Sequence, residues 1–514
     1  MTQLIPKPAN DRSPQQETQS TMDHSRGLNY EENLLWEKGR SDHSGVDLPA
    51  PRGVKLRTGQ VARASIGLPQ VSEPQAVRHF VRLSTKNYSI DSGFFPLGSC
   101  TMKHNPRLNE KLARLPGFAQ VHPLQPASTV QGALKVMFEL QQWLAELTGL
   151  PGVCLTPAAG AHGELAGIMT IAAAHKAKGN THKTVILVPD SAHGTNPATA
   201  AMCGFQLRVI PTRETGRVTL AAFKDALGDG HDVAGMMVTN PNTCGLFERD
   251  ILDISKALHD AGGYFYCDGA NFNALVGKIR PADFGVDVMH INLHKTFSTP
   301  HGGGGPGSGP ICVTDELAQF MPKPIVLHEN GSYRLEENLD RPRACGRIKG
   351  YQGQFGMHVR ALAYMMSHGS DGLRQVSEDA VLNANYILSQ LKQHYNVPFT
   401  GPCMHECLLT DKMQKDAGAT TLDIAKTLIE HGMHPMTIYF PLVVQGAMLI
   451  EPTETESKDS LDRFIRVMKE IAADVASGAV DKLHSYPQAA PARRLDEVKA
   501  AREPKLRWKA SPNS

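Results

Sequence analysis

Between residues 184 and 294 the chain alternates short apolar runs with helical stretches, and this alternation is what most restricts the fold. The runs are rich in Val, Ile and aromatic residues, and the stretch 249–261 between two of them has apolar residues at helical spacing. Such alternation is typical of βαβ units, in which helices cover both faces of a parallel sheet. The sequence therefore predicts an α/β fold with a mainly parallel sheet. The predicted strands are 184–190, 205–212, 233–241, 263–270 and 286–294.

Changes in pattern divide the chain into five segments. A long helix is predicted over 131–149, where Gly149 and Pro151 supply a C-terminal stop. Beyond about 355, helical patterns, including 421–431 and 458–476, mix with strand-like CLLTD and AMLIEPT, which indicates a second, smaller α+β domain. The predicted segments are a polar N-terminal tail (1–50), an N-terminal arm (51–130), a large domain (131–355), a small C-terminal domain (356–485) and a charged C-terminal tail (486–514).

The charges of the chain are almost balanced, with 53 Lys and Arg against 51 Asp and Glu and a formal net charge of +2. This balance favours neither nucleic acid nor an anionic membrane as a partner. No run approaches the roughly 18 uncharged apolar residues of a membrane span, and the first 30 residues have no apolar core of a secretion signal. We therefore expect a cytoplasmic protein.

The nine cysteines form no CxxC pair, which fits a reducing compartment better than a disulfide framework. Only Cys403 and Cys407 lie close together in the sequence. A metal site there would need further ligands at a matching spacing, and no such motif is visible. We therefore interpret this segment as part of the core and predict no metal.

Two of the predicted strands end in residues that can carry chemistry. The run 263–270 ends in Asp268, and the next run ends in Lys295. Ligands of open α/β sheets bind beyond the carboxyl ends of the strands, so we expect the acid and the lysine at the same sheet edge. The lysine could be a surface charge, an ion-pair partner of Asp268, or a Schiff-base amine whose ammonium form is disfavoured by burial.

Small residues at 156–163, including Gly160 and Ala161, lead into an apolar helix, and a helix N-terminus of this kind can bind a phosphate. The glycine run 302–305 lacks the Lys-Ser/Thr ending of a P-loop, so we interpret it as a covering loop. His193 follows another strand and could stack on an aromatic ring. A phosphate cradle, a stacking imidazole, a carboxylate and a lysine are the parts that hold pyridoxal 5'-phosphate.

The chain closely resembles the P-protein of the glycine cleavage system, the decarboxylating glycine dehydrogenase, from about residue 60 to its end. The single-chain form of that enzyme consists of two related halves, and this chain is similar to the second half, as found in subunit 2 of the two-subunit bacterial form. The motifs are DSGFFPLGSCTMKHNP (91–106), GAHGE (160–164), SAHGTNPA (191–198), DGANFNA (268–274), NLHKTFSTPHGGGGPG (292–307) and EPTETESK (451–458).

The resemblance implies the pyridoxal-phosphate-dependent transferase fold of the aspartate aminotransferase type, fold type I. It also implies a reaction, in which glycine loses CO2 and its aminomethyl group passes to the lipoyl arm of the H-protein. The implied partners are a P-protein subunit 1, in a heterodimer that pairs into a heterotetramer, and the lipoylated H-protein. The alternatives are another enzyme of the same fold that uses pyridoxal phosphate, and a non-catalytic subunit of the same complex.

The family's cofactor contacts are carried over by position. Lys295 matches the Schiff-base lysine, Asp268 the partner of the ring nitrogen, and His193 the stacking residue. Gly160 and Ala161 match the phosphate cradle, with His294 as a possible added contact. Small residues such as Gly269 and Ala270 would let the ring lie close to the strand. Asn242 is the expected partner of the ring's phenolic oxygen, although Asn240 is near enough to take that role.

The substrate contacts are less well marked by the sequence. In the family an arm such as the segment from Ser99 to Lys103 lies near the active site, and the hydroxyls of Ser99 and Thr101 and the ammonium of Lys103 could hold the carboxylate of glycine. The alternative is an anchor between domains. Arg347 and Arg360 are further candidates for the group that orients the carboxylate of glycine, and Cys100 could have a redox role.

Overall fold

The computed structural model describes residues 32–40, 43–46, 49, 67–301 and 307–507. The chain divides into two compact units, of which the first contains residues 1–92 and 485–514 and the second residues 93–484. This division passes through the predicted arm at residue 92. Most of the predicted tail 1–50 and all of the glycine run 302–305 lie outside the described residues. No helix in the described ranges is both long and apolar enough to cross a membrane.

The first unit is built from short helices in its described part. They are α1 (Leu35–Lys38), α2 (Glu73–Ser84) and α17 (Glu497–Arg502). The carboxylate of Glu32 joins the N-terminal segment to α2, because it accepts hydrogen bonds from Arg82 and lies 2.9 Å from His79 Nδ1. The helix α17 lies within the segment that we predicted as a charged tail.

A seven-stranded sheet forms the centre of the second unit, in the order β1-β7-β6-β5-β4-β2-β3. The five strands β2 to β6 run parallel to one another, whereas β7 pairs antiparallel with β6 and with β1. The predicted mainly parallel α/β fold is confirmed. The strands are β1 (Gly152–Cys154), β2 (Val185–Pro189), β3 (Gln206–Ile210), β4 (Val233–Thr239), β5 (Tyr264–Gly269), β6 (Val288–Ile291) and β7 (Ile311–Val313).

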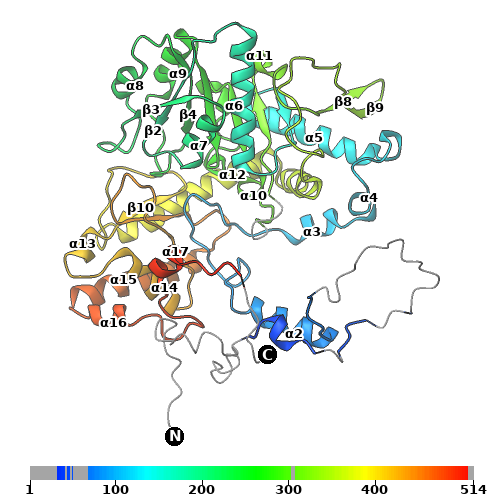
Figure 1. The fold of residues 1–514 in the computed structure, drawn as a ribbon. Coiled ribbons are helices and arrows are strands. Elements are labelled where there is room, and N and C mark those ends of the chain that lie inside the picture. The colour runs from blue at the N-terminus through cyan, green and yellow to red at the C-terminus, as the bar shows by residue number, and fades with distance from the viewer. Residues whose placement is uncertain (1–31, 41–42, 47–48, 50–66, 302–306, 508–514) are drawn as a thin grey trace. The chain divides into compact units, whose positions relative to one another are not determined.

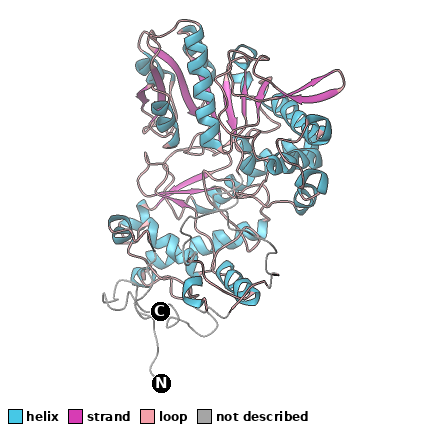
Figure 2. Ribbon diagram, turned by 45° about the vertical axis from the view of Figure 1, so that its right-hand side comes forward, coloured by secondary structure: helices cyan, strands magenta, loops and turns pink. Residues whose placement is uncertain are grey.

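Helices flank this sheet, as Figures 1 and 2 show. Two separate apolar clusters lie against it, one containing residues of α5, α9 and α12 and the other containing residues of α6 and α7. Burial of the strands on both faces explains why their sequences are almost continuously apolar. The helices are α5 (Gln131–Thr148), α6 (Gly160–Ala177), α7 (Thr195–Met202), α8 (Leu220–Leu227), α9 (Ile251–Asp260), α10 (Leu293–Thr296), α11 (Asp315–Ala318) and α12 (Phe355–Leu391).

A smaller antiparallel sheet, in the order β10-β12-β11, lies beyond α12 in the sequence and has its own apolar cluster. Its strands are β10 (Cys407–Thr410), β11 (Thr437–Ile438) and β12 (Ala447–Ile450), and its helices are α13 (Lys412–Lys415), α14 (Thr421–Glu430), α15 (Lys458–Ala476) and α16 (Val480–His484). The segment before the large domain joins this sheet, because Leu97 forms a bridge with Ile450 and the Gly98 amide donates to Leu449 O at 3.2 Å.

The remaining elements lie at the periphery of the second unit. The predicted segment 51–130 contains α3 (Arg107–Ala113) and α4 (Pro116–Ala119), and a hairpin is formed by β8 (Val326–Glu329) and β9 (Ser332–Leu335). The long helix α12 is interrupted at Gly369, whose φ of 64° lies outside the helical region. The sequence pattern places a break at the same glycine.

Candidate active site

Lys295 lies at the carboxyl end of the large sheet, on the single turn of α10 that follows β6. Its Nζ donates to the carbonyl oxygen of Ser99 at 2.7 Å. Ser99 has a φ of 64°, a conformation that is uncommon for a residue with a side chain, and its amide donates to Glu406. The lysine is therefore held by a turn of the segment that precedes the large domain.

Asp268 lies near the end of β5, in register with His290 on the neighbouring β6. Its carboxylate is buried and accepts hydrogen bonds from Asn196 Nδ2 at 3.0 Å and from the Ala270 amide at 2.9 Å. Burial alone would raise the pKa of this carboxyl, but His290, these hydrogen bonds and Lys295 together hold the pKa below its ordinary value. Asp268 is thus a buried group that stays ionised.

Glu164 is a second buried acid beside Asp268, and we did not single it out from the sequence. It accepts hydrogen bonds from Thr195 Oγ1 at 2.7 Å and from Asn196 Nδ2 at 2.9 Å. Burial, and then the charge of Asp268, raise its pKa to about 7. Its place at the end of the GAHGE motif was the available signal. The two acids share Asn196, and near neutral pH Asp268 is ionised while Glu164 is close to its titration midpoint.

His193 lies in the exposed loop after β2 and its Nδ1 lies 2.8 Å from Thr195 Oγ1. The hydroxyl of Thr195 links the imidazole to Glu164. The ring of His193 lies edge-on to that of Phe440, at a centroid distance of 5.9 Å. Stacking of His193 on a cofactor ring stays a prediction.

The predicted phosphate cradle is the N-terminus of α6, an 18-residue helix that begins at Gly160. A side chain at Gly160 would collide with Asn292, and one at Gly309 would collide with the backbone of Ala159. Ala161 is the next residue and is exposed. Glycines thus bring the start of the helix close to the segments that follow β6 and precede β7. The first amide groups of a helix have no partner within the helix, so they are available to a phosphate.

His294 precedes the lysine, and its Nδ1 accepts the Ser308 amide at 3.3 Å. Burial, with the nearby His301, lowers its pKa to about 3. The imidazole is therefore neutral, so it can offer a phosphate a hydrogen bond but no positive charge.

The two asparagines that follow β4 differ in their free hydrogen-bonding groups. Asn242 donates to Gly216 O and to Glu248, both at 2.7 Å, and accepts from the amides of Cys244 and Leu246. Asn240 accepts the amide of Glu248, while its buried Nδ2 has no acceptor among the described residues. The structure therefore favours Asn240 over the predicted Asn242 as the donor to a phenolic oxygen.

Two of the three predicted substrate contacts before the large domain, Thr101 and Lys103, are occupied by protein groups. The buried ammonium of Lys103 donates to Glu454 at 2.7 Å, to Asn273 at 2.9 Å and to Tyr364 at 3.1 Å. The hydroxyl of Thr101 donates to Glu451 at 2.5 Å. These contacts support the alternative of an anchor for Lys103 and Thr101, since all three ammonium protons of Lys103 have acceptors.

The other candidates are also placed by the structure. Arg360 forms an ion pair with Glu110 at 2.7 Å, whereas Arg347 lines a pocket of about 940 Å³ beside the segment 118–134. Burial raises the pKa of the Cys100 thiol, which opposes a redox role. Burial likewise raises the pKa of Cys403 to about 12 and that of Cys407 well above its ordinary value, so neither thiol is prepared to bind a metal.

Comparison with known proteins identifies the family. A protein from Caulobacter vibrioides, named "probable glycine dehydrogenase (decarboxylating) subunit 2", is 57% identical over 98% of this chain and 96% of its own length. A protein of the same name from Desulforamulus reducens is 50% identical over 93% of this chain and 99% of its own length. The chain belongs to the glycine dehydrogenase (decarboxylating) subunit 2 family. Family models agree, since residues 376–492 match "Glycine dehydrogenase, C-terminal domain" and residues 162–329 match "Aminotransferase class-V".

Solved structures show the fold of the chain. A crystal structure of a glycine decarboxylase (P-protein) of the glycine cleavage system, in inhibitor-bound form, is similar with a TM-score of 0.67, at 22% identity, over 82% of this chain and 93% of that chain. An alanine–glyoxylate aminotransferase from Nostoc is similar with a TM-score of 0.54, at 15% identity, over 74% of this chain and 95% of that chain. The predicted transferase fold is confirmed.

The residues of this subunit fit pyridoxal phosphate. Asp268 offers a buried negative charge, Lys295 an amine at the adjoining strand end, and Gly160 the start of a helix. Among the buried side-chain atoms without a hydrogen-bond partner in the described ranges are Asn240 Nδ2 and Ser308 Oγ, which follow β4 and precede β7. Unpaired buried polar atoms are costly, so their presence at one sheet edge favours a polar ligand there.

Proposed function

We propose that this chain is the subunit that binds pyridoxal phosphate and decarboxylates glycine. The proposal rests on one observation, the meeting of Asp268 and Lys295 at adjacent parallel strand ends in a chain of this family. Lys295 is close enough to Asp268 to lower the pKa of that carboxyl. A non-catalytic subunit would need neither group.

Each residue would have a separate task. Pyridoxal phosphate, when bound, supplies a conjugated ring that accepts the electron pair left on the glycine Cα as CO2 departs. Lys295 would hold the aldehyde carbon covalently and release it to glycine. The ionised carboxylate of Asp268 would keep a proton on the ring nitrogen, while Asn196, itself bonded to Glu164, holds that carboxylate in place. Asn240 would donate to the phenolic oxygen.

The chain would work within a larger assembly. The relatives' designation as subunit 2 implies a subunit 1, and we propose the lipoylated H-protein as the acceptor. The aminomethyl carbon of glycine would bond to one sulfur of the lipoyl disulfide, and the other sulfur would become a thiol, so the disulfide is the oxidant. We expect this assembly in the cytoplasm.

Reduction with borohydride tests the assignment of the lysine. The cofactor should be trapped on the peptide that contains Lys295, and the Lys295→Ala variant should trap none. The reaction is tested by exchange of labelled CO2 into the carboxyl group of glycine, which should require the H-protein. Transamination of glycine without the H-protein would overturn the proposed reaction while leaving the cofactor site intact.

A further inference from the structure

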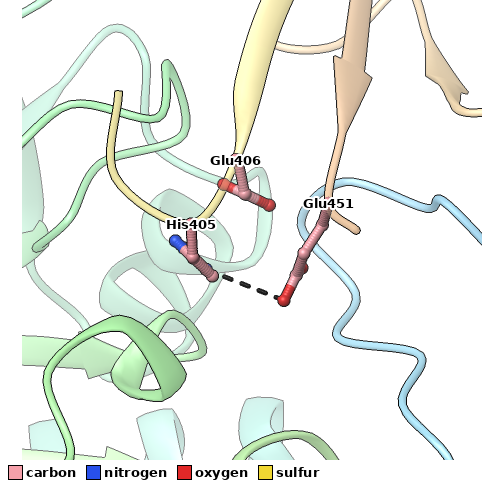
Figure 3. Close-up of side chains that lie close together, drawn as sticks. All are labelled: His405, Glu406 and Glu451. Atoms are coloured by element: carbon pink, nitrogen blue, oxygen red, sulfur yellow. Dashed lines mark ion pairs between the residues drawn. The ribbon is translucent and has the colours of Figure 1, made fainter. Parts of the chain in front are cut away.

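Three buried side chains meet where β10 begins and β12 ends, beside the turn that holds Lys295. His405 and Glu406 precede β10, and Glu451 follows β12. Cys407 pairs with Ile450 across these strands, which brings the two glutamates side by side. All three residues are 0% exposed. Figure 3 shows the two carboxyl groups close to one another and His405 directed toward Glu451.

Each glutamate binds one residue of the preceding segment. Glu406 accepts the Ser99 amide, and Glu451 accepts the Thr101 hydroxyl at 2.5 Å. The ligand oxygens of the two carboxyl groups lie within 4.8 Å of each other. Two buried carboxylates at this separation repel each other, which favours a proton on one of them. Burial raises the pKa of Glu406 to about 7 and that of Glu451 well above its ordinary value.

The same contacts lead directly to the catalytic lysine. Ser99 donates its amide to Glu406 and accepts Lys295 Nζ at its carbonyl oxygen. Its left-handed φ of 64° is unfavourable for a serine, so the bond from Glu406 helps to hold the turn. A single residue, Ser99, therefore connects Glu406 to the amine of Lys295.

We propose that Glu406 and Glu451 share one proton and form a positioning pair for Lys295. The pair fixes the Ser99 turn and presents one negative charge to the lysine instead of two. This inference rests on the proposed function of Lys295. The charge matters because the amine must lose its proton before it can bond to a carbonyl carbon, and a pair with two charges would hold the ammonium form.

Other titratable groups face the pair from the surrounding elements. Lys103 is bound by Glu454, and Lys295 is the other cation. Cys100 and Cys244 have thiol pKa values raised by burial, and burial lowers the pKa of His405 to about 3, so these three groups are uncharged at neutral pH. The shared proton is therefore an adjustable charge beside the lysine on the side of the small sheet, as Glu164 is on the side of the large sheet.

A divalent cation is the alternative occupant of this site. The ligand atoms of His405, Glu406 and Glu451 lie within 4.8 Å of one another, and neither ring nitrogen of His405 has a hydrogen-bond partner among the described residues. A bound cation would displace the shared proton, since it needs ionised carboxylates. Metal analysis of the purified protein is therefore part of the test.

The first measurement is infrared spectroscopy of the cofactor-free protein at neutral pH. The wild type should show the carbonyl band of a protonated buried carboxyl that is absent from both Glu406→Gln and Glu451→Gln, because the remaining carboxylate accepts from the glutamine amide and needs no proton. Persistence of the band in both single variants would mean two protons and would overturn the proposal. So would its absence from the wild type, or a cation bound at one equivalent.

The second measurement is the pH midpoint of the absorbance change of the bound cofactor. Each single variant keeps one negative charge and should keep the midpoint, whereas the double variant lacks the charge and should shift the midpoint downward by about one pH unit. Asp411→Asn, which removes another buried carboxylate near the small sheet, is the matched control and should show no shift. Equal shifts of the midpoint in the single and double variants would contradict the shared proton.

If neither the wild type nor any variant binds the cofactor at Lys295, the proposed function fails. The infrared result still decides whether the proton is shared.

Discussion

Asp268 and Glu164 are both buried acids bonded to Asn196, yet their pKa values are displaced in opposite directions. Asp268 has His290 and the Ala270 amide in addition to Asn196, so its ionised form is stabilised. Glu164 forms no ion pair with a described residue and lies beside the charge of Asp268. Asp268 is therefore suited to hold a proton on a cofactor ring, and Glu164 adds less negative charge beside it than a fully ionised acid would.

Asp268→Asn should lower kcat/KM for the exchange of CO2 with glycine by at least about 100-fold, because loss of one preorganised electrostatic contact costs about 10²–10³ in rate. Cofactor affinity should also fall. The control is Glu164→Gln, whose amide can donate to Thr195 Oγ1 and accept from Asn196 in place of the protonated acid. A similar rate loss in both variants would show that the charge of Asp268 is not the decisive property.

Glu164 also predicts a pH dependence of stability. Its folded pKa of about 7 lies above the ordinary value of 4.5, so the folded state binds more protons than the unfolded state between these values. The contribution of Glu164 to the free energy of unfolding therefore falls as pH rises through this window, by about 2–4 kcal/mol. Glu164→Gln removes this dependence. Urea unfolding of the cofactor-free protein measures this. The free energy of unfolding of Glu164→Gln, relative to that of the wild type, should be higher at pH 8 than at pH 5.

At single-residue resolution the sequence predicted positions better than contacts. Strand ends placed Asp268 and Lys295 at one edge, because the carboxyl ends of parallel strands coincide. The choice between Asn240 and Asn242 depends on which amide the following loop uses, and no local pattern reports that. The partners of Lys103 are 170 to 351 residues away in the chain, so their contacts are set by tertiary packing alone.

At the scale of elements, the N-terminus of α6 depends on close backbone approach. A Cβ at Gly309 would meet the carbonyl carbon of Ala159 and the amide of Gly160, and backbone atoms cannot move aside as a side chain can. We expect Gly309→Ala to cost about 1–3 kcal/mol of stability and to weaken cofactor binding, because it displaces the proposed phosphate site. Gly194→Ala, where a Cβ meets nothing within 4 Å, is the control. Thermal unfolding with and without the cofactor measures both effects, and equal behaviour of the two variants would contradict the cradle.

The elements with a regular apolar period were predictable. The helix expected at 249–261 is α9 (Ile251–Asp260), and the stop expected at Gly149 has the left-handed φ of 70° that ends α5. The hairpin of β8 and β9 was not predicted, because its strands are short and partly exposed and so lack a clear alternation. Short helices such as α3 and α4 were missed because segments of seven and four residues are too short to show a helical period of apolar residues.

At the scale of the whole molecule, the proposed cofactor contacts come from one unit of the chain. Lys295, Asp268, Gly160 and Asn240 all belong to residues 93–484, and the segment that holds the lysine is bound by the small sheet of that unit. We therefore expect covalent binding of the cofactor to need no second chain. The proposed reaction requires more, since the lipoyl disulfide that would accept the electrons and the aminomethyl group would come from another protein.

We therefore expect the purified chain to bind pyridoxal phosphate at Lys295 by itself but to exchange CO2 with glycine poorly until subunit 1 and the lipoylated H-protein are added. The reason is that Lys103 and Arg360, two of the cations predicted to hold the carboxylate of glycine, are already paired within the chain. Spectroscopic titration with the cofactor measures the first property, and labelled CO2 exchange with each component omitted in turn measures the second. Full exchange by the single chain with the H-protein would show that subunit 1 contributes no essential group, and failure to bind the cofactor without subunit 1 would show that the lysine site is completed by the partner.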